Sequence, residues 1–226
     1  MNKINNSSDV DVCPVYSTGE EITNSIIHGI GALLAVAGFL LLCLNITGVV
    51  GGQKEASVDI IAALVFVSAM FGMFLFSTLY HSIQHKGAKN ILRRLDHSMI
   101  YILIAGTYTP FCLIALRGAW GWSILGVEWG LAIAGITLNF INMNALKKLK
   151  TAAYILMGWV ILVGVIPLVR SVQIKTFIFL LIGGVVYTLG TIWYRKKNMK
   201  FSHAIWHSFV LIGAVCHWFA VWNLLY

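Results

Sequence analysis

Long apolar stretches separated by short polar segments dominate the sequence from residue 22 onward. A helix that crosses a bilayer needs about 20 consecutive, mostly apolar residues. Runs of that length predict seven spanning helices, at residues 22–46, 57–81, 96–116, 122–142, 152–169, 174–194 and 203–225. The connections are short, so the expected fold class is all-α, a seven-transmembrane-helix bundle in which neighbours run up and down.

The first twenty residues are polar and lack the apolar stretch of a cleavable signal peptide. We expect residues 1–20 to form a polar cytoplasmic tail and residues 21–226 to form the membrane domain. Composition agrees, since 59% of the residues are hydrophobic and 11% are charged, against about 25% charged in soluble domains. The four cysteines are far apart and form no CxxC pattern, which favours buried, unreactive thiols.

Basic residues lie mainly in alternate connections, and this asymmetry predicts the orientation, because cytoplasmic loops are enriched in Lys and Arg. Of the 16 Lys and Arg residues, the side opposite the N-terminus holds only Lys54, Arg117, Arg170 and Lys175. We therefore expect a multi-pass protein of the cell (inner or plasma) membrane, with the N-terminus cytoplasmic and the C-terminus outside. The net charge of +8 arises from these clusters, and nothing further supports a nucleic-acid partner.

Rare polar residues gather at the cytoplasmic ends of four predicted helices. Ionisable groups inside a span are costly and indicate a functional site by default. The set comprises Glu21, Asn24 and His28 in the first helix, Ser77 and His81 in the second, Asp96 and His97 in the third, and His203 and His207 in the seventh. Because the orientation rests on Lys and Arg alone, the shared depth of these residues is independent evidence for one site.

The spacing of the histidines favours a metal ion. His203 and His207 are four residues apart and so share one face of a helix, as metal-binding histidine pairs do. With His81 they give three imidazoles and an open fourth position, the set of a catalytic zinc site. Asp96 could orient a ligand or hold a water, whose pKa zinc lowers to about 7. The pattern predicts Zn²⁺ on these histidines, supported by a polar network of Glu21, Asn24 and His28.

Other histidines keep alternatives open. A histidine pair near a helix end can simply lie in the interfacial region. His85 forms a second HxxxH with His81, but it falls in a basic loop, where we expect it to be mostly solvated. His97 stays open as an alternative ligand. His217 lies about 15 Å deeper than His207 at 1.5 Å per residue, which predicts an interhelical hydrogen bond instead of metal binding.

Two further features lie away from this cluster. Glu128 falls near the expected outer start of the fourth helix, where an interfacial position explains it. Thr107, Tyr108 and Thr109 precede Pro110 in the middle of the third helix, where proline frees a backbone carbonyl. The simpler expectation is a kink at which nearby hydroxyl groups compensate the lost backbone bond. The more specific expectation is that these residues line a lipid cavity.

Four short motifs, each on its expected helix, carry a family resemblance. They are Glu21-x2-Asn24-x3-His28-Gly29, Ser77-x2-Tyr80-His81, Leu95-Asp96-His97 followed by Ala105-Gly106-Thr107-Tyr108-Thr109-Pro110, and His203-x2-Trp206-His207. Together they resemble the bacterial haemolysin III family, which is similar to the progestin and adipoQ receptors and, more distantly, to alkaline ceramidases. The resemblance covers roughly residues 21–217. It implies zinc on the same three histidines, with Asp96 reaching the zinc through water and Ser77 beside it.

The resemblance also implies a function on membrane lipids. Relatives suggest hydrolysis of a lipid amide such as a ceramide, and bacterial members carry labels of cytolysis and of membrane-fluidity homeostasis. We expect a zinc-dependent hydrolase of a lipid amide or ester in the cytoplasmic half of the bilayer. Asp96 would move the proton and Ser77 would stabilise the oxyanion. Two alternatives stay open, namely a non-enzymatic regulator of lipid or fluidity homeostasis with a structural zinc, and a cytolytic pore former.

Overall fold

The computed structural model describes residues 14–47, 57–141, 149–196 and 198–225. The helices in these residues are α1 (Thr18–Ile46), α2 (Ser57–Ser82), α3 (Lys86–Pro110), η1 (Phe111–Leu116), α4 (Gly118–Ile141), α5 (Lys150–Trp159), η2 (Val160–Gly164), α6 (Val165–Ser171), α7 (Ile174–Arg195) and α8 (Ser202–Leu225). Because α3 continues into η1, and α5, η2 and α6 form one unit, these elements make 7 units long and apolar enough to cross a membrane. The predicted all-α bundle of seven spanning helices is confirmed within the described residues.

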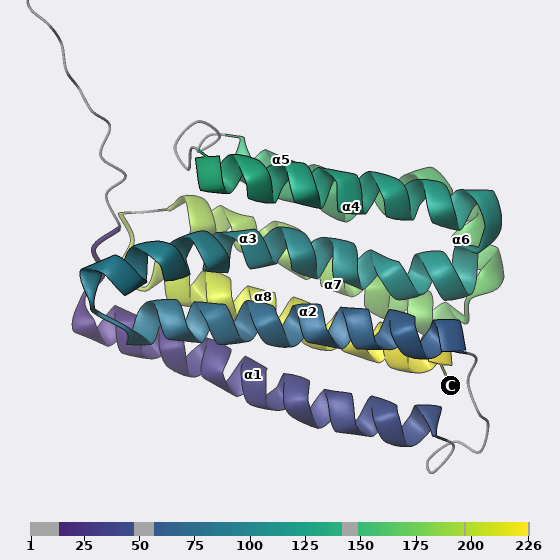
Figure 1. Cartoon of the computed structure of the whole chain (residues 1–226), viewed down its shortest axis with the longest axis horizontal. Coiled ribbons are helices and arrows are strands. Elements are labelled where there is room, and N and C mark those ends of the chain that lie inside the picture. The colour runs from purple at the N-terminus through teal and green to yellow at the C-terminus, as the bar shows by residue number, and fades with distance from the viewer. Residues whose placement is uncertain (1–13, 48–56, 142–148, 197, 226) are drawn as a thin grey trace, which may run out of the picture.

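The spans lie side by side in one bundle, and their directions alternate along the chain (Figure 1). We call the end at which α1, α3, α5 and α8 begin the proximal end of the bundle, and the opposite end the distal end. Helix α8 packs against α1, α2 and α7, while α2 packs against α1 and α3. The first turns of α1 and α8 therefore meet the last turn of α2 at the proximal end.

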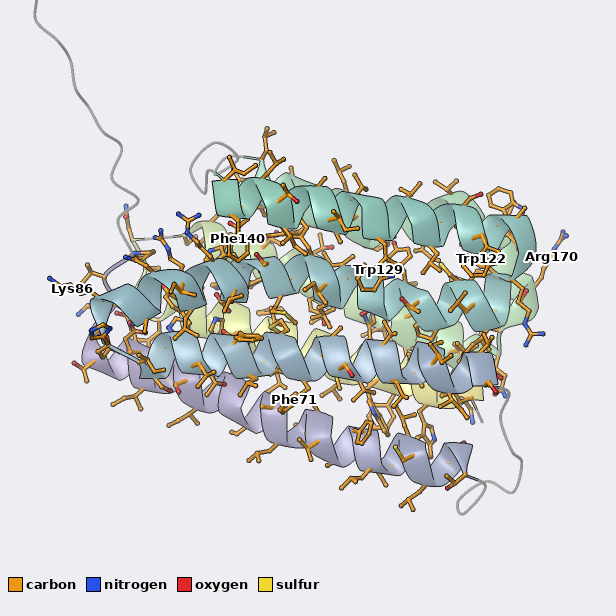
Figure 2. All side chains as sticks on the ribbon, viewed as in Figure 1. Phe71, Lys86, Trp122, Trp129, Phe140 and Arg170 are labelled. Atoms are coloured by element: carbon orange, nitrogen blue, oxygen red, sulfur yellow. The ribbon has the colours of Figure 1, made fainter. Side chains whose placement is uncertain are left out.

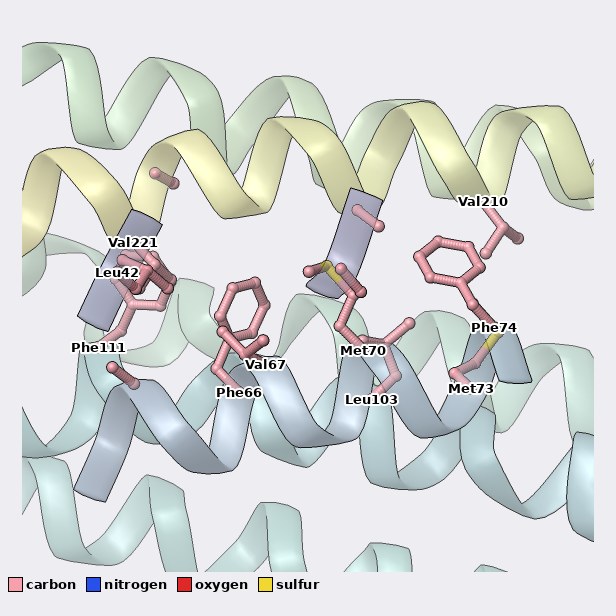
Figure 3. Close-up of a cluster of buried hydrophobic side chains, with 14 of the residues drawn as sticks. Leu42, Phe66, Val67, Met70, Met73, Phe74, Leu103, Phe111, Val210 and Val221 are labelled. Carbon is pink, nitrogen blue, oxygen red and sulfur yellow. The ribbon is translucent and has the colours of Figure 1, made fainter. Parts of the chain in front are cut away.

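The largest group of buried apolar side chains lies between α2, α3 and α8 (Figure 3). Phe66, Met70 and Phe74 follow one another at intervals of four residues on α2, so they share one face of the helix. They belong to one cluster with Leu103 of α3 and Val210 of α8. In a bilayer such contacts stabilise by close packing, because lipid tails are as apolar as the side chains themselves.

The outer surface carries apolar side chains along the body of the bundle. Leu33 of α1, Leu156 of α5 and Ile133 of α4 are 73%, 71% and 63% exposed. Exposed apolar area on this scale indicates contact with a membrane. Figure 2 shows Lys86 at the proximal end and Arg170 at the distal end, with the long apolar body between them. The surface is that of a multi-pass membrane protein.

The third span begins earlier than predicted, at Lys86 instead of residue 96. Its first ten residues are rich in Lys and Arg, so a criterion based on apolar runs assigns them to a loop. In the structure Lys89 and Arg93 are part of α3 and are buried, with 8% and 5% exposed. Lys89 donates to Glu21 of α1, which shows that a basic residue can lie inside the bundle when an acidic partner meets it.

The first helix also begins earlier than predicted, at Thr18 instead of residue 22. Ser17 and Glu20 form a capping box, in which the Ser17 hydroxyl accepts from the Glu20 amide and the Glu20 carboxylate accepts from the Ser17 amide. Such a pair satisfies two backbone donors that the first turn leaves free. Most of the predicted cytoplasmic tail, residues 1–20, lies outside the described residues.

The middle of the third span departs from α-helical geometry at Pro110, which is followed by the π-helical segment η1. The hydroxyl of Thr107 donates to the carbonyl of Leu103 at 2.7 Å, and that of Thr109 donates to the carbonyl of Ala105 at 2.9 Å. Neither carbonyl is the one that Pro110 leaves without a donor, which is that of Gly106, four residues earlier, so these bonds do not test the predicted compensation of the freed carbonyl. Breaks of this kind are tolerated within a membrane only where other groups replace the lost backbone bonds.

Glu128 lies in the middle of α4, and the predicted interfacial position is wrong. It is 0% exposed, on the same buried face as Ile124 and Ala132. Helix α4 begins at Gly118, so Glu128 lies about 15 Å inside the span at 1.5 Å per residue. Its two carboxyl oxygens have no hydrogen-bond partner among the described residues.

Candidate metal centre

Three histidines bring their ring nitrogens together near the proximal end. His81 of α2 and His203 and His207 of α8 each offer one nitrogen, and these atoms lie within 4.8 Å of one another. His81 and His207 are 1% and 2% exposed. Zinc binds histidine at about 2.0–2.1 Å, which places tetrahedral ligands about 3.3 Å apart. The Nε2 atoms of His203 and His207 are already 3.0 Å apart, so a small adjustment of His81 would fit the group to an ion.

Glu21 holds the ring of His81 in a fixed orientation. Its Oε2 lies 2.6 Å from His81 Nδ1, and its Oε1 accepts from the Lys89 ammonium at 2.5 Å. A carboxylate only accepts, so Nδ1 carries a proton, which leaves Nε2 as the nitrogen that can offer a lone pair to a metal ion. That Nε2 has no hydrogen-bond partner among the described residues. Metal-binding histidines characteristically show this carboxylate partner on the second nitrogen, and His81 therefore fits the role of a ligand.

The other residues of the predicted network on α1 contact the same histidines. The carbonyl of Asn24 lies 3.4 Å from His207 Nδ1, and its side-chain amide lies 3.4 Å from His81 Nδ1. The ring of His28 stacks on that of His207, with centroids 3.7 Å apart and planes 7° apart. Glu21, Asn24 and His28 follow at intervals of three and four residues and thus share one face of α1. The structure brings all three to the histidine cluster.

Asp96 and His97 lie beside the cluster but outside the group of three. Asp96 lines a cavity together with His203 and His207. One of its carboxyl oxygens is 3.6 Å from His97 Nδ1. That nitrogen lies 2.8 Å from the carbonyl of Arg93 and donates to it. His97 is thus held by its own helix, and both Asp96 and His97 line the cavity that His203 and His207 also line.

Ser77 and His85 flank His81 in the sequence and have opposite environments. Ser77 lies one turn earlier on α2, is 0% exposed, and its hydroxyl has no hydrogen-bond partner among the described residues. A spacing of four residues places it on the same helix face as His81. His85 is exposed and caps α3, where its Nδ1 accepts from the Ala88 amide at 3.4 Å. The prediction that His85 is solvated is confirmed.

An apolar cavity of about 140 Å³ leads from the histidines into the bundle. Its wall comes from side chains of α1, α2, α3, η1, α5, η2, α6, α7 and α8, and many of them are apolar, such as Met73, Leu103, Phe111 and Val210. Thr107 and Tyr108 also line it, so two of the three hydroxyl residues before Pro110 lie on the cavity wall. A shape with a polar end and an apolar body suits a ligand with a polar linkage and an apolar chain.

Tyr16 lies over the histidines just before α1 begins, a position that the hydrophobic pattern did not indicate. Its ring stacks on His203 with centroids 5.1 Å apart, and its edge meets His81 at 5.7 Å. Glu20 fixes this segment, because its Oε1 accepts from the Phe201 amide just before α8. Burial, reinforced by the nearby acidic groups, raises the pKa of the Tyr16 hydroxyl above its usual range. The signal that could have found it is the Ser17-x-x-Glu20 capping box, which marks the helix start.

Comparisons with known proteins identify the family of this chain. The family model described as "Haemolysin-III related" matches residues 16–218. Hemolysin-3 of Bacillus cereus is 42% identical over 202 residues, which cover 89% of this chain and 90% of the relative. The Hemolysin-3 homolog of Bacillus subtilis (strain 168) is 41% identical over 207 residues, covering 92% and 95%. Monocyte to macrophage differentiation factor of Homo sapiens is 27% identical over 174 residues, covering 74% and 71%. The matched range runs from Tyr16, over the histidines, to the last third of α8, and the chain belongs to the haemolysin-III related family.

Proposed function

We propose that this protein is a zinc-dependent hydrolase that cleaves a lipid amide, such as a ceramide-like lipid, or an ester, inside the membrane. One observation carries the proposal. Three ring nitrogens lie within 4.8 Å of one another, and two of these histidines, His203 and His207, line an apolar cavity in a domain built of membrane spans. A lipid amide matches both parts, because its acyl chain suits the cavity and its polar linkage suits the histidines.

The chemistry of the donors favours zinc. Neutral imidazole is among the preferred ligands of zinc, and three protein ligands with an open position are typical of catalytic sites. When bound, zinc supplies Lewis acidity toward a carbonyl oxygen and lowers the pKa of water. Glu21 and Asn24 hold His81 and His207 with Nδ1 engaged, so that both rings present Nε2 toward the site.

Two further side chains have roles in this reaction. Asp96 borders the cavity beside His203 and His207, where its carboxylate would accept a proton from the attacking water and return it to the leaving amine. The buried hydroxyl of Ser77 has no hydrogen-bond partner among the described residues. It would donate to the carbonyl oxygen as negative charge develops there.

The route of the substrate follows from Tyr16. Its ring lies against His203 and His81 at the proximal end, so a ligand would reach the histidines along the apolar cavity and not from the water beyond Tyr16. The distribution of Lys and Arg predicts that the proximal end is cytoplasmic. The reaction would then take place in the cytoplasmic half of the cell membrane. Labelling of single cysteines from each side of intact cells would test the orientation.

The test of the hydrolase combines metal content with turnover in detergent-purified protein. Wild type should bind about one zinc per chain and consume a fatty amide. His207→Ala should lose both properties. Asp96→Asn should keep the metal and the thermal stability but lose turnover, because it removes only the proton acceptor. Normal turnover by metal-free protein would overturn the proposal.

A structural zinc is the second candidate, and the placement of the ligands favours it. They join α2 to α8, and Glu21 adds α1 through His81, so an ion would hold three helices together. In a non-enzymatic regulator of membrane state, loss of metal would lower the melting temperature, and Asp96→Asn would change nothing measurable. Two relatives are named Hemolysin-3 and Hemolysin-3 homolog; release of dye from liposomes tests whether this chain forms pores.

A further inference from the structure

Two residues that line the distal part of the cavity each carry a buried polar atom without a partner among the described residues. His217 of α8 and Tyr187 of α7 both line it, and their ring centroids are 5.3 Å apart. His217 Nδ1 and the Tyr187 hydroxyl are buried, and neither has a hydrogen-bond partner in the described part of the chain. Most buried polar groups in proteins are paired, and the hydrocarbon core of a bilayer offers no water in exchange. Two such atoms on neighbouring side chains that line a cavity indicate a ligand group.

Two glycines create the space for these rings. A Cβ at Gly183 of α7 would overlap the ring of His217, and a Cβ at Gly213 of α8 would come within 2.8 Å of the ring of Tyr187. Each ring therefore lies against the glycine of the opposite helix. Glycine within a helix is destabilising relative to alanine, so this arrangement has a cost that the placement of the two rings offsets. The rings are held in fixed positions, and their polar atoms are fixed with them.

The hydrogen bond of His217 determines which chemistry the free atom requires. Its Nε2 lies 3.2 Å from the carbonyl of Leu180 on α7, which confirms the predicted interhelical bond. A carbonyl only accepts, so Nε2 carries the proton, and Nδ1 of the neutral ring is an acceptor that needs a donor. The ring is neutral because a buried imidazolium without an anionic partner is costly. The Tyr187 hydroxyl can donate or accept.

A hydroxyl group matches this pair, and a carbonyl does not. An alcohol can donate to His217 Nδ1 and accept from the Tyr187 hydroxyl at the same time. A ketone or ester oxygen would satisfy Tyr187 and leave Nδ1 without a donor. The site lies ten residues beyond His207 on α8, about 15 Å along the helix axis.

We propose that His217 and Tyr187 bind a hydroxyl group on the chain of the lipid in the cavity. The protein would then prefer hydroxylated acyl chains, with the hydroxyl about 15 Å from the group at the histidine cluster. This inference rests on the part of the proposed function that places an acyl chain in the cavity, and it does not depend on hydrolysis.

Binding without turnover tests the inference. Purified full-length protein in detergent is loaded with a fluorescent fatty acid, which is then displaced by stearic acid or by monohydroxystearic acids that differ only in the position of the hydroxyl. One position should displace the probe about tenfold better than stearic acid, the effect expected of two additional hydrogen bonds. Neighbouring positions should show less or no advantage.

Variants identify the residues responsible. Tyr187→Phe removes one hydroxyl and keeps the ring over Gly213, so it should reduce the preference while stearic acid binds as before. His217→Phe should abolish the preference. Thr107→Val is the matched control, because its hydroxyl lies on the same cavity but is already bonded to the carbonyl of Leu103.

Each outcome decides the inference. Equal displacement by stearic acid and by all its hydroxylated forms would overturn it, as would a preference that survives both Tyr187→Phe and His217→Phe, or failure of every fatty acid to bind. A preference that these variants remove, in a protein that hydrolyses nothing, would support the inference and refute the hydrolase. Turnover without any hydroxyl preference would refute the inference and support the hydrolase.

Discussion

Two regions of this bundle each contain a buried glutamate, and the two glutamates differ in whether polar side chains surround them. At the proximal end Glu21 is 7% exposed and is bonded to both His81 and Lys89. In the middle of α4 Glu128 is 0% exposed and has no partner among the described residues. Burial of a carboxylate is costly in either place. The difference teaches that an acidic residue inside a span indicates a site only where other polar side chains converge on it.

The presence or absence of polar partners around a buried glutamate determines how much its substitution changes the stability of the protein. Removing one member of a buried ion pair leaves the other charge uncompensated, which is strongly destabilising. Replacing a buried polar group that lacks partners by an apolar one of similar size is close to neutral or stabilising. Substitutions of polar residues in the proximal region should therefore change the stability strongly, and substitution of Glu128 should change it weakly.

The largest effect is expected from removing the histidine that Glu21 orients. His81→Ala should reduce bound zinc from about one per chain to background, because two remaining imidazoles do not form a structural or catalytic zinc site. Elemental analysis of detergent-purified protein measures this, and a chelator should lower the melting temperature of wild type but not of the variant. His85→Ala is the matched control, since it removes the exposed histidine of the second HxxxH. Equal metal in both variants would refute the site.

The second-largest effect is expected on the zinc affinity when Glu21 is substituted. Glu21→Gln removes the charge that accepts from His81 and Lys89, and loss of such a carboxylate partner weakens metal binding by about 10–100-fold. Competition with a chelator of known affinity measures the change. Glu20→Gln alters the adjacent glutamate, whose carboxylate caps α1 and accepts from the Phe201 amide, and it should leave the zinc affinity unchanged. If both variants behave alike, Glu21 has no special relation to His81.

Glu21 and His81 also show what can be predicted from sequence. Depth along a span follows from residue number, at 1.5 Å per residue, once the apolar runs have located the helices. That is why Glu21, His81 and His207 could be assigned to one level from the sequence alone. The orientation of side chains around each helix axis does not follow from apolar runs, and neither do their partners across the bundle. The bond between Glu21 and His81 depends on both, so only the folded arrangement of α1 and α2 reveals it.

The errors have a common physical origin. Lys89 was assigned to a loop because positive charge normally ends a span, yet Glu21 provides an acidic partner inside the bundle. Glu128 is expected at an interface because it lies close to the predicted start of the fourth helix, yet α4 begins earlier, at Gly118, and buries it. Tyr16 precedes every apolar run, so hydropathy assigns it no place. For Lys89 and Tyr16 a tertiary contact determines the environment, and for Glu128 the start of the helix does; local composition indicates neither.

Tyr16 should affect the proximal region less than Glu21, because it covers the histidines without orienting them. Tyr16→Ala removes the ring stacked on His203, so zinc should be retained but should pass to a chromogenic chelator several-fold faster than from wild type. Tyr16→Phe keeps the stacking ring and should release zinc at the wild-type rate. Release from Tyr16→Ala at the wild-type rate would show that the segment before α1 does not limit access.

The smallest effect is expected at Glu128, and it tests the other side of the comparison. Glu128→Leu replaces a carboxyl group without partners among the described residues by an apolar side chain of similar volume, so the melting temperature of the metal-free protein should stay the same or rise. Glu21→Leu in the same metal-free protein should lower it, because the buried ammonium of Lys89 loses its acidic partner and keeps only the neutral Gln84. Glu128→Gln, which keeps the shape and a polar head, separates the effect of polarity from that of packing. A melting temperature that falls as far for Glu128→Leu as for Glu21→Leu would mean that Glu128 makes a stabilising interaction of its own, and burial without partners would then be no guide to function in this bundle.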